Sequence, residues 1–268
     1  MKKLLILIMV LLGLFLAACG EDDDDNTPVE VMGYKLQQFV DKGVVNLLVD
    51  SAAPDTVDYR NLFAYQIIGA DGFNPRQGST GGYDLSWPTF KDGYLVPSQD
   101  GKTLFPNTPD LPGAYKVRNA AEFKLYRKVD VSAGRGSKQI ELWGLPIHTD
   151  ILNWNSEAES SVKLSDLLGG IAAYDSVKFV ANDASAVYTP AQVNDGYYLL
   201  TSERTTFPTL NDSMDGLHKK FKRLAEIVVY GATIDNFTWV NADTTHAAIT
   251  ITIPTDLSTY TSESVPGL

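Results

Sequence analysis

Residues 162–168 read Val-Lys-Leu-Ser-Asp-Leu-Leu, and residues 34–40 read Tyr-Lys-Leu-Gln-Gln-Phe-Val, with the same apolar spacing around a shared Lys-Leu pair. Five pairs of segments match in the same order along the chain: 34–40 with 162–168, 65–71 with 177–183, 92–95 with 195–199, 103–106 with 205–208, and 123–131 with 221–229. One match could arise by chance, but five in one order predict a tandem duplication.

Each matched block predicts a local structure. The leucines of 164–168 lie at three-and-four spacing, which predicts a short helix that Gly169-Gly170 ends. Apolar residues alternate along 177–181, as they do in a half-buried strand. The Asp-Gly pairs at 92–93 and 195–196 are turn signals, because both residues tolerate turn conformations.

These elements predict an α+β fold that is mostly β, built from two tandem related domains of mixed sheets with short helices. The expected divisions are a lipoprotein signal peptide (1–18), an acidic tether (19–32), the first repeat (33–131), a linker (132–137), the second repeat (138–230) and a C-terminal tail that contains a strand (231–268).

The N-terminal segment predicts export and lipid anchoring. Lys2 and Lys3 precede an apolar run of the length found in secretory signal peptides, which is too short to cross a bilayer. The run ends in Leu16-Ala17-Ala18-Cys19, which resembles the lipobox of bacterial lipoproteins, and Cys19 is the only cysteine of the chain. We expect Cys19 to be acylated, and several acyl chains make a stable anchor.

The charge pattern bears on location and partners. The run 21–25 is acidic and should form a solvated tether, and it also resembles the export signals of surface lipoproteins. We therefore expect an outer-membrane lipoprotein, either on the periplasmic face or on the cell surface. The net charge is −11, and it becomes −13 when Lys2 and Lys3 leave with the signal peptide. Such a chain is not expected to bind nucleic acid, which requires cations to neutralise phosphates.

The order of motifs from Ile140 to Tyr230 resembles a known family. It runs from a strand through Gly-Leu-Pro, a Lys-Leu-Ser-Asp-Leu-Leu helix, a Val-Lys-Phe-Val strand, a turn, a Tyr-Leu-Leu strand, a Phe-Pro loop and Lys-Phe-Lys-Arg-Leu to a final apolar strand. This order resembles the molybdopterin-binding domain of the sulfite oxidase family, and residues 34–131 resemble it more weakly. The resemblance implies a sheet-rich domain that binds a molybdenum cofactor.

The chain departs from that family at the metal ligand. The family's ligating cysteine lies between the short helix and the next strand, where this chain has residues 169–175 without a cysteine. A molybdenum centre of this kind needs a soft sulfur ligand. We therefore expect no cofactor, and a corresponding cavity near 170–175 that is reduced or filled. Four cationic residues could be a remnant phosphate clamp or a solvated basic strip, and the strip is favoured because such residues mostly lie at the surface: Lys219, Lys220, Lys222 and Arg223.

Other polar residues give no catalytic or metal site. His148, His218 and His246 stand in unrelated contexts, without a second ligand at a metal-binding spacing. The acid pairs Asp71/Asp92 and Asp183/Asp195 could work as an acid and a base, but aspartates of this kind are expected to cap turns.

Aromatic residues provide the candidate ligand site. Aromatic rings bind ligands by stacking and by burying apolar area. Trp154 is the best candidate, because polar residues surround it, and Tyr83 and Trp87 come second. The favoured function is a non-catalytic module that binds an unknown protein or small molecule. The alternative is a molybdopterin-dependent oxidoreductase-like enzyme on the sulfite oxidase-like scaffold.

Overall fold

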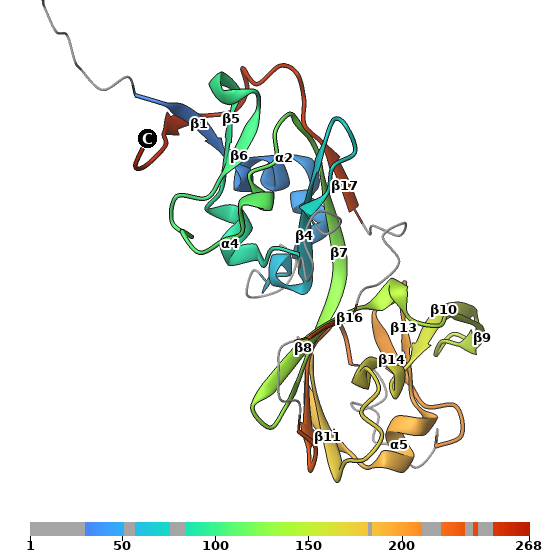
Figure 1. The fold of residues 1–268 in the computed structure, drawn as a ribbon. Coiled ribbons are helices and arrows are strands. Elements are labelled where there is room, and N and C mark those ends of the chain that lie inside the picture. Colours follow the sequence, from blue (N-terminus) through green and yellow to red (C-terminus); the bar gives the residue numbers. More distant parts are fainter. Residues whose placement is uncertain are drawn as a thin grey trace, which may run out of the picture. The chain divides into compact units, whose positions relative to one another are not determined.

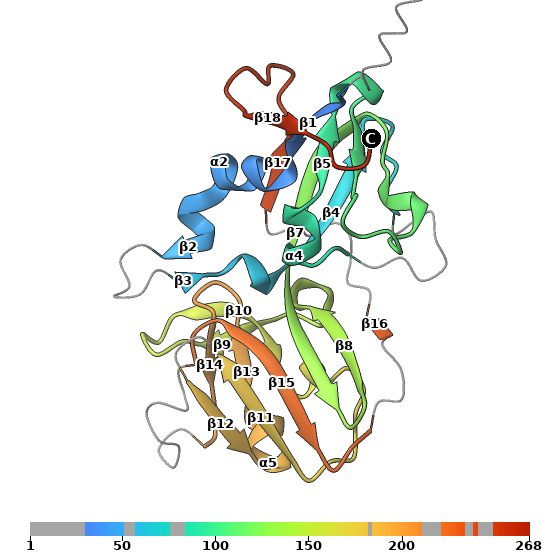
Figure 2. The same cartoon turned by 90° about the vertical axis from the view of Figure 1, so that its left-hand side faces the viewer.

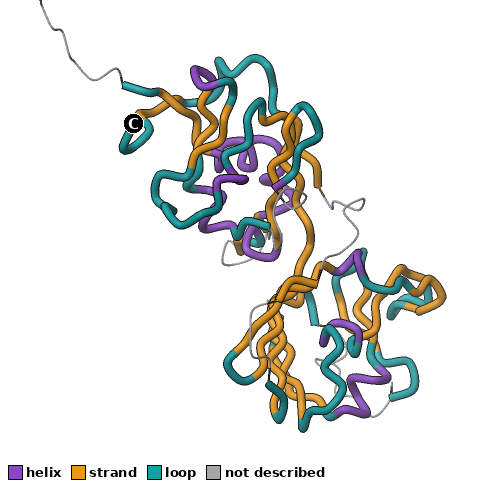
Figure 3. The backbone as a smooth tube through the Cα atoms, in the orientation of Figure 1, coloured by secondary structure: helices purple, strands orange, loops and turns teal. Residues whose placement is uncertain are grey.

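Strands make up most of the regular structure in the computed structural model, which describes residues 30–50, 57–75, 84–181, 184–210, 221–233, 238–240 and 249–268 (Figure 3). The α-helices in these ranges are α2 (Leu36–Leu48), α4 (Trp87–Lys91) and α5 (Pro190–Asp195). The mostly β character predicted from the sequence is confirmed. The predicted signal peptide and Cys19 lie outside the described residues.

The strands, in chain order, are β1 (Met32–Lys35), β2 (Val49–Asp50), β3 (Val57–Asp58), β4 (Phe63–Gly69), β5 (Tyr94–Val96), β6 (Lys102–Leu104), β7 (Ala120–Ala133), β8 (Gly136–Glu141), β9 (His148–Leu152), β10 (Ala158–Lys163), β11 (Ser176–Ala181), β12 (Ser185–Tyr188), β13 (Tyr197–Leu199), β14 (Arg204–Thr206), β15 (Leu224–Tyr230), β16 (Thr238–Val240), β17 (Ile249–Thr252) and β18 (Ser262–Ser264). Short 3-10 helices are η1 (Arg60–Leu62), η2 (Pro97–Gln99), η3 (Gly113–Tyr115), η4 (Leu142–Gly144) and η5 (Asp166–Leu168).

Strand β7 takes part in both halves of the fold (Figure 1). Its first part pairs antiparallel with β4 and β17, and its second part pairs antiparallel with β8 and parallel with β15. Two four-stranded sheets accompany it, in the orders β18-β1-β5-β6 and β14-β13-β10-β9. All of these strands belong to one compact unit, Met32–Leu268.

Two hydrophobic cores form on this framework. The first gathers α2, β4, α4 and the first part of β7, and Phe90 stacks on Tyr65 with ring centroids 4.6 Å apart. The second gathers η5, β11, β13 and β15, and it buries the three leucines predicted to share one face, Leu164, Leu167 and Leu168. The predicted helix is therefore one 3-10 turn, which ends at Gly169 in the left-handed conformation that favours glycine.

The C-terminal segment packs on the first core (Figure 2). β18 pairs antiparallel with β1, and the Tyr260 ring stacks on Phe39 at 4.6 Å. Gln38 donates to the Thr261 carbonyl at 2.7 Å and accepts from the Thr261 amide at 2.8 Å. The end of the chain thus completes the sheet that its first strand begins.

One arrangement of strands and turns occurs in both halves. Val162 and Lys163 lie opposite Tyr198 and Tyr197, as Tyr34 and Lys35 lie opposite Leu95 and Tyr94. The amide of Leu164 donates to the Gly196 carbonyl at 3.0 Å, and that of Leu36 donates to Gly93 at 2.9 Å. Both glycines sit where a methyl group would overlap the neighbouring leucine and phenylalanine, Leu164 and Phe207 at Gly196 and Leu36 and Phe105 at Gly93.

The register of the last matched strands differs from the prediction. Phe123 of β7 lies opposite Ile67, and Ile227 of β15 lies opposite Phe179. If the two halves are repeats in which Ile67 matches Phe179, the counterpart of Phe123 would be Ile227, six positions beyond the predicted Phe221. The pairing register shifts at the same point in both pairs, between Ile68 and Gly69 and between Val180 and Ala181.

Candidate functional site

Trp154 lies at the tip of the hairpin that joins β9 to β10. The Asn153 side chain builds this turn, because its Oδ1 accepts from the amides of Asn155 at 2.9 Å and Glu157 at 3.1 Å. Ser156 takes a left-handed conformation with φ 64°. With its neighbours directed into the turn, Trp154 keeps 46% of its surface exposed, as its polar sequence context predicted.

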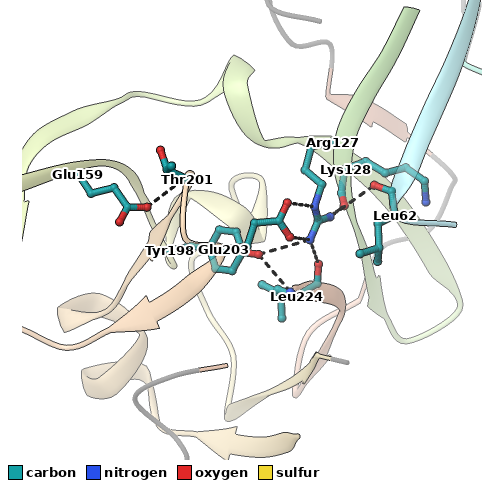
Figure 4. A network of polar contacts seen from close by, with 8 residues as sticks. All are labelled: Leu62, Arg127, Lys128, Glu159, Tyr198, Thr201, Glu203 and Leu224. Atoms are coloured by element: carbon teal, nitrogen blue, oxygen red, sulfur yellow. Dashed lines mark hydrogen bonds and ion pairs between the residues drawn. The ribbon is translucent and has the colours of Figure 1, made fainter. Parts of the chain in front are cut away.

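Fixed polar groups surround the Trp154 ring. The Arg204 guanidinium lies over it, 5.1 Å from the ring centroid. The Glu159 carboxylate accepts from the amides of Thr201 at 2.8 Å and Ser202 at 2.6 Å, and Figure 4 shows the first of these bonds. The recess beside Trp154 measures about 510 Å³. Another recess, of about 590 Å³, lies beside residues 171–175. The Trp154 recess is lined by Asn153, Trp154, Glu157, Ala158, Glu159, Ser160, Thr201 and Ser202.

The other aromatic candidates do not join this recess. Trp87 is only 5% exposed, because it opens α4 and packs in the first core, with its ring centroid 5.3 Å from that of Tyr65. The Arg60 guanidinium lies 4.7 Å from the Trp87 ring centroid. This placement corrects the expectation that Trp87 is a ligand-binding residue. Tyr83 lies outside the described residues.

The predicted basic strip is described only in part, since Lys219 and Lys220 lie outside the described residues. Arg223 stacks on Tyr59, with its guanidinium 3.5 Å from the ring centroid. Lys222 pairs through its backbone with Arg204. Neither Lys222 nor Arg223 lines the cavity beside residues 171–175. The two described members are therefore not arranged there as a phosphate clamp.

The cavity near 170–175, expected to be reduced or filled, is not filled. Its volume is about 590 Å³. Gly169 and Gly170 both have positive φ, and the small side chains of Ala172 and Ala173 leave room beside the loop. The lining residues are Ser165, Leu168, Ile171, Ala172, Ala173, Tyr174, Asp175, Pro190, Asn194 and Gly231.

The lining of this cavity does not fit a molybdopterin. The described lining offers no sulfur ligand and no cation, whereas a molybdenum centre needs sulfur and a phosphate group needs positive donors. Asp175 would instead place a carboxylate beside the phosphate. Burial raises the pKa of Tyr174, so this lining phenol stays protonated and neutral. The residues of the cavity favour a ligand without negative charge.

Arg127 organises a polar network that the sequence did not reveal (Figure 4). It donates to the Glu203 carboxylate at 3.1 Å, to the Leu224 carbonyl at 2.6 Å and to the Tyr198 hydroxyl at 3.4 Å. Burial lowers the pKa of Arg127, but Tyr198 and Glu203 outweigh that effect and the pKa is raised. Burial also raises the pKa of Tyr198. The network joins β7 to the residues around β13 and β15.

Asp71 and Asp195, one member of each acid pair, have structural roles. The Asp71 carboxylate accepts from the Phe73 amide at 2.9 Å, which is a turn-capping bond. Asp195 accepts from the Thr209 amide at 3.2 Å and the Leu210 amide at 3.1 Å, and it thereby holds the loop after β14. His148 begins β9 and meets the Tyr197 ring edge to face. Asp183, His218 and His246 lie outside the described residues.

Comparisons with protein-family models, with curated proteins and with solved structures found no match to this chain. Among the described residues, no group of three or more His, Cys, Asp or Glu side chains could hold a metal ion. A search of the same residues finds no helix that is both long and apolar enough to span a membrane.

Proposed function

We propose that this chain is a lipid-anchored lipoprotein of the bacterial envelope, and that it binds a ligand or partner non-catalytically through the recess at Trp154. The observation that carries the proposal is the exposed Trp154 ring beside a polar recess whose groups are already held by backbone bonds. Ligand sites combine an apolar contact surface with a few polar groups in fixed positions, and this recess has both features.

The anchor is supported by the sequence around Cys19. A charged start, an apolar run and small residues before the only cysteine form a lipoprotein leader, and the acidic residues 21–25 supply a tether. The protein would then stand on the outer membrane, on the periplasmic face or at the cell surface, with its recess free to meet envelope material.

The architecture behind the recess is proposed to be a pair of tandem related domains. Matched strand pairings, matched glycine turns and matched register shifts in the two halves support a duplication. The hairpin that carries Trp154 is formed by β9 and β10, and β18 pairs with β1 at the corresponding edge of the other copy. Trp154 would thus be a feature that distinguishes one copy from the other.

Site-specific photo-crosslinking on living cells tests this function. A photoreactive phenylalanine, whose aromatic ring keeps a surface on which a ligand can stack, replaces Trp154 in the full chain, and a matched variant carries it at Val187, which is 57% exposed on β12. The proposal predicts a discrete adduct at position 154 that is absent at position 187. Equal labelling at both positions, or no adduct at position 154, would contradict a binding role for the recess.

A further inference from the structure

The Trp154 ring is held in place before any ligand arrives. The Arg204 guanidinium lies over the ring at 5.1 Å from its centroid, a distance at which cation–π attraction is favourable. Nearly half of the Trp154 surface nevertheless stays exposed. A ring held in this way loses little conformational freedom when a ligand stacks on it, and preorganisation of this kind strengthens binding.

The floor of the recess is equally fixed. Two successive amides, of Thr201 and Ser202, donate to one carboxylate oxygen of Glu159. Asn153 donates to Glu157 at 3.2 Å and reaches Glu159 at 3.5 Å. The carboxylates and the amide group are therefore oriented around the recess, and carboxylate oxygens can accept several hydrogen bonds each.

One polar atom beside this floor lacks a hydrogen bond. The Ser202 hydroxyl is buried and has no partner in the part of the chain that the structure describes. It is unfavourable to leave a buried polar group without its hydrogen bond. Because Ser202 lines the recess, a ligand hydroxyl that enters could complete the missing bond after a rotation of the side chain.

Charge narrows the class of ligand. Glu157 and Glu159 line the recess and the whole chain carries a net charge of −11, so an anionic ligand would be repelled. A cationic ligand would be attracted by these carboxylates, but it would be repelled by the Arg204 guanidinium, which already lies over the indole ring. A neutral ligand with many hydroxyl groups meets neither obstacle.

We propose that the Trp154 recess binds a neutral saccharide, with the indole ring against one apolar sugar face and the polar rim on the sugar hydroxyls. The recess volume of about 510 Å³ lies in the range of about 300–1,000 Å³ that is usual for small-molecule sites. This inference rests on the proposed binding function and names the ligand class of the same site.

The test uses the full chain in a detergent without a sugar headgroup, because glycosidic detergents would compete. The probe is an array of neutral glycans of two to six sugar units, followed by calorimetry with those that bind. At least one glycan should bind in the micromolar to millimolar range. Trp154→Ala should weaken that binding at least tenfold, whereas Leu152→Ala should not change it, since Leu152 is 54% exposed on β9 but does not line the recess.

Two results would overturn the proposal that the recess binds a saccharide. One is an array without any glycan that binds more tightly than about 10 mM, and the other is glycan binding that survives Trp154→Ala. The crosslinking experiment at position 154 separates this failure from that of the proposed function. If adducts form there while no glycan binds, the site recognises another class of ligand, and if neither occurs, both proposals fall.

Discussion

Arg127→Met should destabilise the protein through a defined set of lost contacts. The Arg127 side chain is 3% exposed, and its removal takes one donor from the Leu224 carbonyl and one from the Tyr198 hydroxyl, which still accepts from the Leu224 amide at 3.2 Å. Removing one partner of a buried ion pair lowers the free energy of unfolding by about 3–5 kcal/mol. The Glu203 side chain is 25% exposed and regains water, so we expect the lower end, about 3 kcal/mol.

Urea unfolding followed by tryptophan fluorescence measures this change. With a slope of about 3 kcal/mol per molar urea, the midpoint should fall by about 1 M. Arg118→Met is the matched control, because Arg118 is exposed, and surface substitutions usually stay within about 0.5 kcal/mol. If Arg127→Met shifts the midpoint no further than Arg118→Met does, the network in Figure 4 does not stabilise the fold as argued.

Three further predictions concern the anchor, the pH dependence and the turns. Cys19→Ala should abolish lipid attachment, because only the thiol accepts the lipid, and membrane retention of a cleaved, unlabelled mutant in fractionation would refute this. Burial raises the pKa of Tyr65 and Tyr198. Their contribution to the free energy of unfolding is therefore present below about pH 10 and is lost as the pH rises further. Ultraviolet titration should show that these two tyrosines ionise only when the protein unfolds. Gly196→Ala should lower the free energy of unfolding by about 1–3 kcal/mol, because the added methyl group overlaps neighbouring side chains. Gly113→Ala is the control and should not change the urea midpoint, because the space around Gly113 is open.

Local patterns predicted the turns and the recurring helix–strand order because those signals reside in adjacent residues. The sequence match aligns Phe123 with Phe221, whereas the pairings of the partner strands align Phe123 with Ile227, six positions further on. A strand repeats its inward-facing positions every two residues, so a shift by an even number keeps apolar residues inward. The pattern in 123–131 and 221–229 therefore cannot choose between these registers, and the partner strands decide.

The candidate site was predictable where its neighbours are close in sequence. Trp154 follows Asn153, whose side chain builds the turn that exposes it. Trp87 follows the polar Ser86, but its helix places the ring against Tyr65, which lies far away in the sequence. The partners of Arg127 come from β13, β15 and the turn before β14, and the local sequence of β7 does not predict them.

Saccharide binding at Trp154 can be measured most directly by fluorine NMR. The full chain is labelled with 5-fluorotryptophan, and the Trp154 resonance is assigned by its loss in Trp154→Phe. Soluble glycans released from the envelope of the same cells are then titrated in. The Trp154 resonance should shift while that of buried Trp87 stays in place. A spectrum in which Trp154 does not respond, or in which Trp87 responds equally, would contradict it.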